Sequence, residues 1–487
     1  MADSIRNKTV KGVGWSFADN IFNQGITFLV GLVLARLLTP EEYGLIGIIT
    51  IFISLFNSIV DSGFSNALIR KNDAQDSDYS TVFLTNLVLS IVLYFVLYLC
   101  APAISSFFNQ PMLVPLTRVM GVIVIINAFG LIQRTIMTRN VDFKTQAKVS
   151  LIASVLSGVV GVVMAVRGMG VWSLAGQQIS RQFLNSLLLW VYSTWYPSLR
   201  FSVQSFKELF GFGWKLLVSG LISTLWNEIY QVVIGKFYSA DTLGQYTRAY
   251  QFSSIFSSNL TSVVQRVSYP VLSKMQDDKA RLKNGYQKVI KCAMLISFCC
   301  LLGLAAIAEP MVLTLIGEQW LPCVPLLQLI CLQMMLYPLH AINLNMLQVQ
   351  GRSDLYLKLE IIKKIIAVGP LLLGIFVNIH LMLAGSVITG FISYFLNAYY
   401  SGTFLNYSIR EQLKDIFPSF LIALVMAVTV YAISFINLAP VIVLIIQILV
   451  AFAVVIVLCE LTRLDAYVEL KDMAAYFIKR NRNGNGK

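Results

Sequence analysis

Residues 12–37, GVGWSFADNIFNQGITFLVGLVLARL, and residues 211–236, GFGWKLLVSGLISTLWNEIYQVVIGK, are two copies of one membrane-spanning unit. Just beyond them, the motif at 39–44, TPEEYG, is echoed at 239–244 by SADTLG, so that the offset between copies drifts only from 199 to 200 residues. We therefore predict two like lobes. A binding site between them would open alternately to either side of a membrane as the lobes rock.

The composition is that of a polytopic membrane protein. Of 487 residues, 57% are hydrophobic and only 13% are charged, which lies outside the range of soluble domains. Apolar runs of roughly 20 residues or more, the length that crosses about 30 Å of hydrocarbon, lie at 12–37, 43–68, 79–103, 113–135, 147–167, 171–195, 209–235, 245–272, 287–308, 321–348, 358–378, 381–405, 415–435 and 440–462. These runs are continuously apolar, whereas the strands of a membrane barrel must alternate apolar and polar residues.

The sequence thus predicts an all-α integral membrane protein with about fourteen transmembrane helices. They form two six-helix pseudo-repeat lobes at 1–200 and 201–408, two accessory helices at 409–465, and a basic cytoplasmic tail at 466–487. The accessory pair is uncharged from residue 417 to 458, which indicates contact with lipid or with a partner. Beyond residue 463 we expect a short interfacial helix.

Basic residues predict the orientation, because cytoplasmic loops retain Lys and Arg. One set of loops and termini carries Arg6, Lys8, Lys11, Arg139, Lys144, Lys148, Lys274, Lys279, Arg281, Lys283, Lys288, Lys471, Lys479, Arg480 and Arg482, whereas the opposite loops carry only Arg36, Arg167 and Lys236. Both termini are therefore expected in the cytoplasm. This bias, together with anionic lipid headgroups, accounts for the net charge of +13. We expect no nucleic-acid partner, since no soluble domain is left to carry one.

Polar side chains follow single faces of several predicted spans. Span seven carries a stripe at every fourth residue, made of Lys215, Ser219, Ser223, Asn227 and Gln231. The polar face of span one consists of Ser16, Asp19, Asn20, Asn23, Gln24 and Thr27, and that of span two of Ser54, Asn57, Asp61 and Ser65. Single Ser, Thr and Asn residues commonly join helices by hydrogen bonds. A stripe along a whole span instead favours water beside it and predicts a wet cavity.

Charges inside spans are costly and therefore indicate function. Arg181 lies ten residues into its span, about 15 Å along the helix and too deep for easy snorkelling. Intramembrane cations suit an anionic ligand, above all a phosphate or a pyrophosphate. The predicted substrate-binding residues are Arg181, Lys215, Arg248, Arg266, Arg118, Asn23, Asn227 and Gln231.

Three acidic residues of the same spans, Asp19, Glu228 and Asp61, have two alternative roles. They neutralise neighbouring cations, or they take up H⁺ or Na⁺ as a coupling site. We predict no catalytic residue, metal ligand or cofactor. The two histidines and seven cysteines are too scattered for a metal site.

Several motifs carry a family resemblance: GVGW at 12–15, LARLLTPEEYG at 34–44, DSGFSNALIR at 61–70, YPVLSKMQDD at 269–278 and GEQWLP at 317–322. As a set they resemble the polysaccharide transporter (Wzx-like flippase) branch of the multidrug/oligosaccharidyl-lipid/polysaccharide exporter superfamily, and within it the colanic-acid and teichuronic-acid exporters. The resemblance implies a flippase for a polyprenyl-pyrophosphate-linked oligosaccharide, such as an undecaprenyl pyrophosphate glycan, in the bacterial cytoplasmic membrane. Polysaccharide polymerases and glycosyltransferases would be its partners, beside membrane lipids.

Two other functions are open to the same sequence. A multidrug or small-solute antiporter of the superfamily would favour an acidic, aromatic cavity, whereas intramembrane Arg and Lys outnumber Asp and Glu here. A membrane glycosyltransferase or polymerase generally needs a sizeable external loop with catalytic groups, and the external loops predicted here are short.

Overall fold

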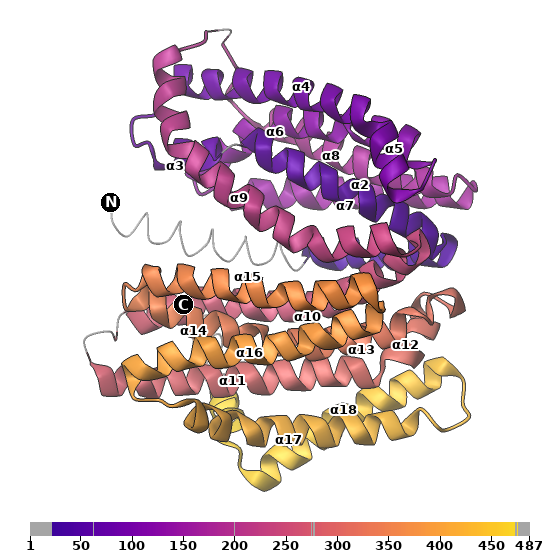
Figure 1. Cartoon of the computed structure of the whole chain (residues 1–487), viewed down its shortest axis with the longest axis vertical. Helices are drawn as coiled ribbons and strands as arrows, with labels where there is room; N and C mark the ends of the chain where they lie inside the picture. The colour runs from indigo at the N-terminus through magenta and orange to yellow at the C-terminus, as the bar shows by residue number, and fades with distance from the viewer. Residues whose placement is uncertain are drawn as a thin grey trace, which may run out of the picture. The chain divides into compact units, whose positions relative to one another are not determined.

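The computed structural model describes residues 22–61, 63–198, 200–273, 275, 278–472 and 475. Within this part of the chain every regular element is helical (Figure 1). The chain divides into two compact units, Met1–Thr247 and Arg248–Lys487. The finding of an all-helical membrane protein agrees with the predicted fold class.

Unit one contains a helix at Phe22–Leu37 and then α2 (Pro40–Asp61), α3 (Phe64–Arg70), α4 (Asp76–Phe108), α5 (Leu113–Met120), α6 (Val122–Arg139), α7 (Phe143–Val166), α8 (Val171–Tyr192) and α9 (Val203–Phe237). Helix α7 packs along α8, α6 along both α8 and α4, and α2 along α9. The core where α3, α4, α6 and α9 meet is closed by Leu68, Phe83, Ile132 and Leu209, each almost fully buried. Span seven of the sequence, α9, therefore packs within unit one.

Unit two begins within α10 (Ala240–Ser273), which starts in unit one. It continues with α11 (Lys279–Ala306), α12 (Ala308–Leu315), a 3₁₀ turn η1 (Glu318–Trp320), α13 (Cys323–Met334), α14 (Tyr337–Val349), α15 (Ser353–Phe376), α16 (Ile379–Leu405), α17 (Ile409–Ile433) and α18 (Pro440–Thr462). Helix α11 packs against α17, α15 against α16, and α17 against α18.

Ten helical stretches of the described residues are long and apolar enough to cross a membrane. The sequence predicts about fourteen, and the other four are explained by their polarity or position. Residues 22–37 form a shorter apolar helix, and the start of that predicted span lies outside the described residues. Helices α8, α10 and α15 have spanning length, at 22, 34 and 24 residues, but carry more polar side chains.

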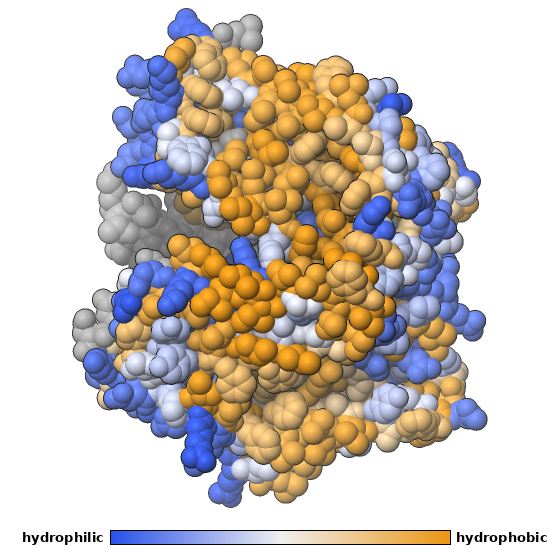
Figure 2. Space-filling model, viewed as in Figure 1, coloured by the Kyte–Doolittle hydropathy of each residue, from blue (hydrophilic) through white to orange (hydrophobic). Residues whose placement is uncertain are grey.

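Apolar side chains face outward along α17 and α18, among them Phe417, Val428, Phe452 and Leu461, each more than half exposed. Figure 2 shows such hydrophobic side chains over the middle of the helices of each unit and hydrophilic ones toward the helix ends. An exposed apolar belt of this kind fits a hydrocarbon surrounding, because outward-facing Leu, Val and Phe have no free-energy cost of exposure there.

The echoed motifs at 39–44 and 239–244 cap the first turns of α2 and α10 in the same way. The Glu42 carboxylate accepts a hydrogen bond from the Thr39 amide at 2.8 Å, and the Thr39 hydroxyl accepts from the Glu42 amide. In the second copy the Ser239 hydroxyl accepts from the Thr242 amide at 3.1 Å. Ser and Thr at this position satisfy amides that have no partner inside the helix.

The glycines that end the two motifs bring these first turns into backbone contact within unit one. A methyl group added to Gly44 would lie 1.8 Å from the Ala240 carbonyl oxygen, and one added to Gly244 would lie 1.8 Å from the Pro40 carbonyl oxygen. The contact is therefore reciprocal. Only residues without a side chain let two helix backbones approach so closely.

We predict that Gly44→Ala and Gly244→Ala each destabilise the protein by about 1–3 kcal/mol, because the backbones must separate to admit the methyl group. Gly47→Ala, one turn further along α2, is the matched control, since its methyl group would meet only Leu243 and Thr247 side-chain atoms at 3.6 Å. The measurement is the midpoint of thermal unfolding in detergent. Equal midpoints for Gly44→Ala and Gly47→Ala would contradict the proposed packing.

Candidate functional site

Arg181 lies within a polar cluster of unit one that joins three helices. Its guanidinium donates a hydrogen bond to the Asn23 side-chain oxygen at 2.9 Å. The same oxygen accepts from the Ser154 hydroxyl at 2.6 Å. Arg181 and Asn23 are both partly exposed. The structure thus brings together two predicted substrate-binding residues from segments 158 positions apart.

A second chain of hydrogen bonds begins at the next residue of α8. Gln182 donates to Asn127 of α6 at 2.8 Å, and Asn127 donates to Asn57 of α2 at 3.1 Å. Amide side chains both donate and accept. They can therefore hold these helices together and also offer hydrogen bonds to sugar hydroxyls.

Of the predicted acidic residues, Asp61 and Glu228 lie in the described part of the chain, whereas Asp19 does not. The Asp61 carboxylate accepts from the Ser65 hydroxyl at 2.5 Å and from the Ser65 amide at 3.3 Å, so it caps the first turn of α3. Glu228 accepts a hydrogen bond from Gln231, also on α9, at 2.5 Å. The ion-coupling role of all three stays a prediction.

The polar stripe of α9 is accessible on the surface of unit one. Lys215 and Asn227 are exposed, and Gln231 is partly exposed. Lys215 lies twelve residues into a helix of 35, which spans about 52 Å and so projects roughly 11 Å beyond each side of the hydrocarbon. With α9 centred on the membrane, the Lys215 α-carbon would lie about 7 Å inside that border, so the long side chain could reach the interface.

Two other predicted cations are held by aromatic rings near helix ends. The Arg118 guanidinium of α5 lies 4.4 Å from the centre of the Tyr98 ring. Arg248 is buried in unit two, where it donates to Gln251 at 2.6 Å and lies 5.6 Å from the centre of the Trp320 ring. Both arrangements stabilise local packing through cation–π contact.

Arg266 lines a cavity of about 350 Å³ in unit two. The other lining residues, from α10, α14 and α15, are Gln265, Leu344, Asn345, Gln348 and Tyr356. None of these carries a negative charge, while the amides and the phenol supply hydrogen-bond donors and acceptors. The cavity can therefore receive an anion and hydroxyl groups together.

Sequence reasoning singled out Arg266 and the polar side chain of Gln265 but missed their neighbours on α14 and α15. Asn345 and Gln348 lie three positions apart on α14, a spacing that places side chains on one helix face, and this was the available signal. It also missed Glu360 and Lys363, an ion pair on α15. The signal for this pair was an acidic and a basic residue three positions apart within one predicted span.

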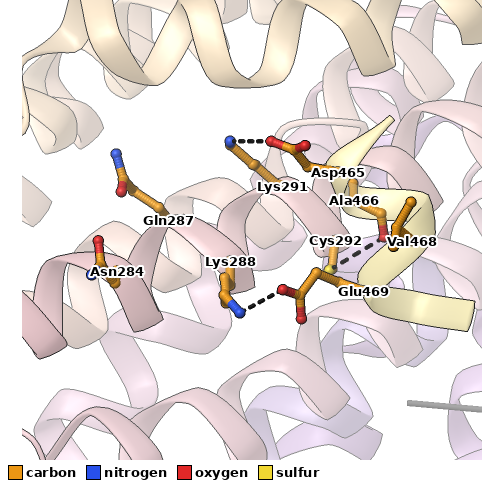
Figure 3. A pocket seen from close by; sticks show the side chains of 9 residues that line it. All are labelled: Asn284, Gln287, Lys288, Lys291, Cys292, Asp465, Ala466, Val468 and Glu469. Carbon is orange, nitrogen blue, oxygen red and sulfur yellow. Dashed lines mark hydrogen bonds and ion pairs between the residues drawn. The ribbon is translucent and has the colours of Figure 1, made fainter. Parts of the chain in front are cut away.

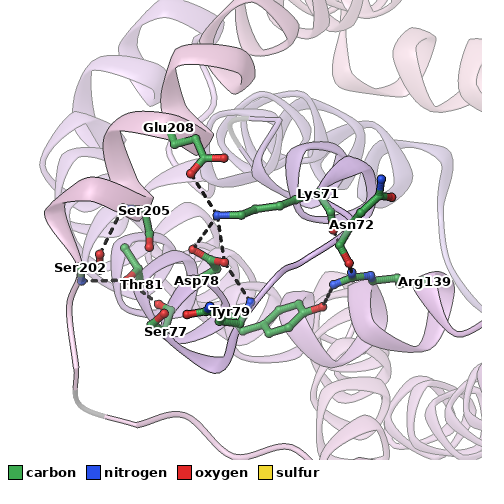
Figure 4. Close-up of polar contacts among 11 residues, drawn as sticks. Lys71, Asn72, Ser77, Asp78, Tyr79, Thr81, Arg139, Ser202, Ser205 and Glu208 are labelled. Atoms are coloured by element: carbon green, nitrogen blue, oxygen red, sulfur yellow. Dashed lines mark hydrogen bonds and ion pairs between the residues drawn. The ribbon is translucent and has the colours of Figure 1, made fainter.

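Lys71 is held by ion pairs and Arg139 by hydrogen bonds (Figure 4). The Lys71 ammonium lies 3.1 Å from the Asp78 carboxylate and 3.0 Å from that of Glu208. Burial lowers the pKa of Lys71, but the hydrogen bonds and negative charges of Glu208 and Asp78 outweigh burial and raise that pKa overall. The Arg139 guanidinium donates to the Lys71 carbonyl at 2.8 Å. These basic residues are thus structural.

A cavity of about 370 Å³ lies where residues 465–472, which form a helix, meet α11 (Figure 3). Lys291 pairs with Asp465 at 3.1 Å and Lys288 with Glu469 at 2.5 Å. The acidic groups neutralise both lysines, so this cavity suits an anion less than the one at Arg266. Across the described residues, no group of three or more His, Cys, Asp or Glu side chains is placed to hold a metal ion.

The fold is shared with solved transporters. A lipid II flippase, MurJ in an inward closed conformation, superposes with a TM-score of 0.74 over 92% of this chain and 98% of its own, at 14% identity. An inward-facing multidrug resistance MATE family transporter of the MOP superfamily superposes with a TM-score of 0.62 over 79% of this chain and 94% of its own, at 19% identity. The protein is thus a multi-pass membrane protein with the MOP-superfamily fold.

Sequence comparison gives the family. Residues 33–325 match the family described as polysaccharide biosynthesis protein, and the chain belongs to it. The teichuronic acid biosynthesis protein TuaB of Bacillus subtilis is 27% identical over 72% of this chain and 73% of its own. The lipopolysaccharide biosynthesis protein WzxC of Escherichia coli is 26% identical over 88% of both chains. The succinoglycan biosynthesis transport protein ExoT of Rhizobium meliloti is 26% identical over 68% of this chain and 67% of its own. The resemblance noted in the sequence is confirmed.

We predict that Arg181→Ala weakens binding of inorganic pyrophosphate to the purified protein by about tenfold or more, because a charge-assisted hydrogen-bond donor is lost. Arg167→Ala is the matched control, since it removes the same charge from an exposed arginine that follows α7 and lies outside the predicted site. We expect it to lower thermal stability slightly and to leave binding unchanged. Titration calorimetry in detergent measures the affinity for pyrophosphate, and scanning calorimetry measures the thermal stability. Identical affinities of the two variants would contradict a role for Arg181 at the anion site.

Proposed function

We propose that the protein translocates a polyprenyl-pyrophosphate-linked oligosaccharide from the inner to the outer leaflet of the bacterial cytoplasmic membrane, for surface polysaccharide biosynthesis. Support comes from intramembrane Arg181 and the acid-free cavity at Arg266, in a chain of the polysaccharide biosynthesis family. Arginine forks match phosphate oxygens, and the surrounding amides match sugar hydroxyls. No covalent step is needed.

The proposed mechanism is alternating access. Two six-helix lobes, within about fourteen spans and with both termini in the cytoplasm, would rock to expose the cavity to each side in turn. Capture of the pyrophosphate requires tighter binding in the inward state than in the outward state. Asp19, Glu228 and Asp61 remain the candidates for H⁺ or Na⁺ coupling. Polymerases and glycosyltransferases of the same polysaccharide are the proposed partners.

Mass spectrometry of membrane lipids, in cells depleted of the protein and in cells that re-express it, tests the substrate class. We expect depletion to build up a polyprenyl-pyrophosphate oligosaccharide, wild type to clear it, and Arg181→Ala to leave it in place. The Arg167→Ala variant, expressed at the same level, is the control that should clear it. Normal surface polysaccharide with no lipid-linked intermediate in depleted cells would favour drug or small-solute antiport instead.

A further inference from the structure

Unit one has an almost wholly apolar cavity of about 480 Å³, a volume within the roughly 300–1,000 Å³ usual for ligand sites. We call it the phenylalanine groove; it is lined by Phe64, Leu84, Thr85, Val88, Leu89, Val92, Phe201, Phe206 and Phe210. Thr85 adds little polarity, because its hydroxyl donates to the Thr81 carbonyl at 2.8 Å within α4. The groove therefore favours a hydrocarbon chain.

Aromatic stacking makes one wall of the groove rigid. The rings of Phe206 and Phe210, one turn apart on α9, stack with centroids 5.5 Å apart and planes at 9°. Phe64 of α3 contacts both, with centroids at 6.1 Å and 6.2 Å. Phe201, just before α9, lies 6.0 Å from Phe206. A preformed wall of this kind costs little ordering when a ligand binds.

With α4 centred on the membrane, the groove would cover one leaflet. Helix α4 has 33 residues, or about 50 Å, so it extends roughly 10 Å beyond each border of a 30 Å hydrocarbon layer. Leu84 and Val92 lie about 12 Å and 24 Å from its start, near the membrane border and near the midplane. The start of α4 carries the Lys71–Asp78 pair, at the end predicted to be cytoplasmic. This is the leaflet from which the proposed substrate would be collected.

Positive charge lies at the chain positions beside the groove. Arg200 and Lys207 are both exposed, and they directly adjoin the lining residues Phe201 and Phe206 in the sequence. The neighbouring Glu208 is ion-paired at 3.0 Å with a lysine that follows α3. A diphosphate carries more negative charge than the phosphodiester of a phospholipid, so these cations favour the diphosphate.

We propose that the phenylalanine groove binds the isoprene units next to the diphosphate of the lipid-linked substrate, with Arg200 and Lys207 facing that diphosphate. This proposal rests on the proposed function and adds where the tail is held. The branched isoprenoid chain is bulkier than a linear acyl chain and makes fuller contact with a wide aromatic groove.

Photo-crosslinking tests the occupant. The full-length protein, with p-benzoylphenylalanine in place of Val88, is placed in phosphatidylethanolamine and phosphatidylglycerol vesicles that contain a minor fraction of polyprenyl diphosphate. The matched control replaces Leu99, which is also exposed on α4 but lies outside the groove. Mass spectrometry gives the ratio of polyprenyl to phospholipid adducts. We expect this ratio to be about tenfold higher at residue 88, as a preference of one order of magnitude in affinity gives.

A charge variant tests the rim. The double substitution Arg200→Ala and Lys207→Ala should lower capture of polyprenyl diphosphate at residue 88 by about tenfold. Capture of the matching polyprenol, which lacks phosphate, should not change. The variant Val88→Trp, which fills the groove, should slow clearance of the lipid-linked glycan in depleted cells, whereas Leu99→Trp should not. Both variants place an indole on α4, one inside the groove and one outside it.

Equal adduct ratios at residues 88 and 99, or phospholipid adducts alone at residue 88, would overturn the groove assignment. So would normal clearance by a folded Val88→Trp variant. These failures leave the proposed function standing if the lipid-linked glycan still accumulates on depletion. Absence of that accumulation would instead remove the proposed function, and the assignment of a substrate tail to the groove with it.

Discussion

A polar side chain on a transmembrane helix must find a partner in the protein or face water, because hydrocarbon offers none. The structure meets this constraint in two ways. Hydroxyls such as those of Thr81, Thr85 and Thr135 donate to the carbonyl one turn back on their own helix. Amides such as Asn127 reach across to other helices. The first device is local, whereas the second decides which helices pack together and so shapes the cavities.

The helices were predictable because hydrophobic length alone indicates a span, and the end caps at Thr39 and Ser239 follow from local sequence. The contacts of Gly44 with Ala240 and of Gly244 with Pro40 were not predictable, since the sequence shows the echo but not that its two copies touch. Several predicted spans also proved to be two helices. The run at 321–348 divides into α13 and α14, so one helical periodicity does not extend through the whole run.

The sequence indicated which residue types belong to the candidate site, but it did not indicate which side chains each arginine contacts. Depth along the span singled out Arg181, and its hydrogen bond to Asn23 joins two residues of the predicted set. Depth could not separate Arg118 or Arg248 from Arg266, because a nearby aromatic ring or an amide cavity is a property of tertiary packing. Tyr98, Trp320 and Gln348 come from other helices or turns, and no spacing rule relates them to the arginines they adjoin.

The two polar cavities of unit two show how a basic sequence can hold cations with different roles. In the first half of α11, Lys288 and Lys291 are matched by Glu469 and Asp465, so the pairs fasten the helix at 465–472 and leave little attraction for an anion. At Arg266 the lining contains amides and a phenol but no carboxylate. An anion entering there gains attraction without displacing a protein carboxylate. Binding energy of that kind, if it differs between two conformations, can drive a change between them. The placement of acidic residues, more than that of basic ones, therefore separates a site for an anionic headgroup from a structural contact.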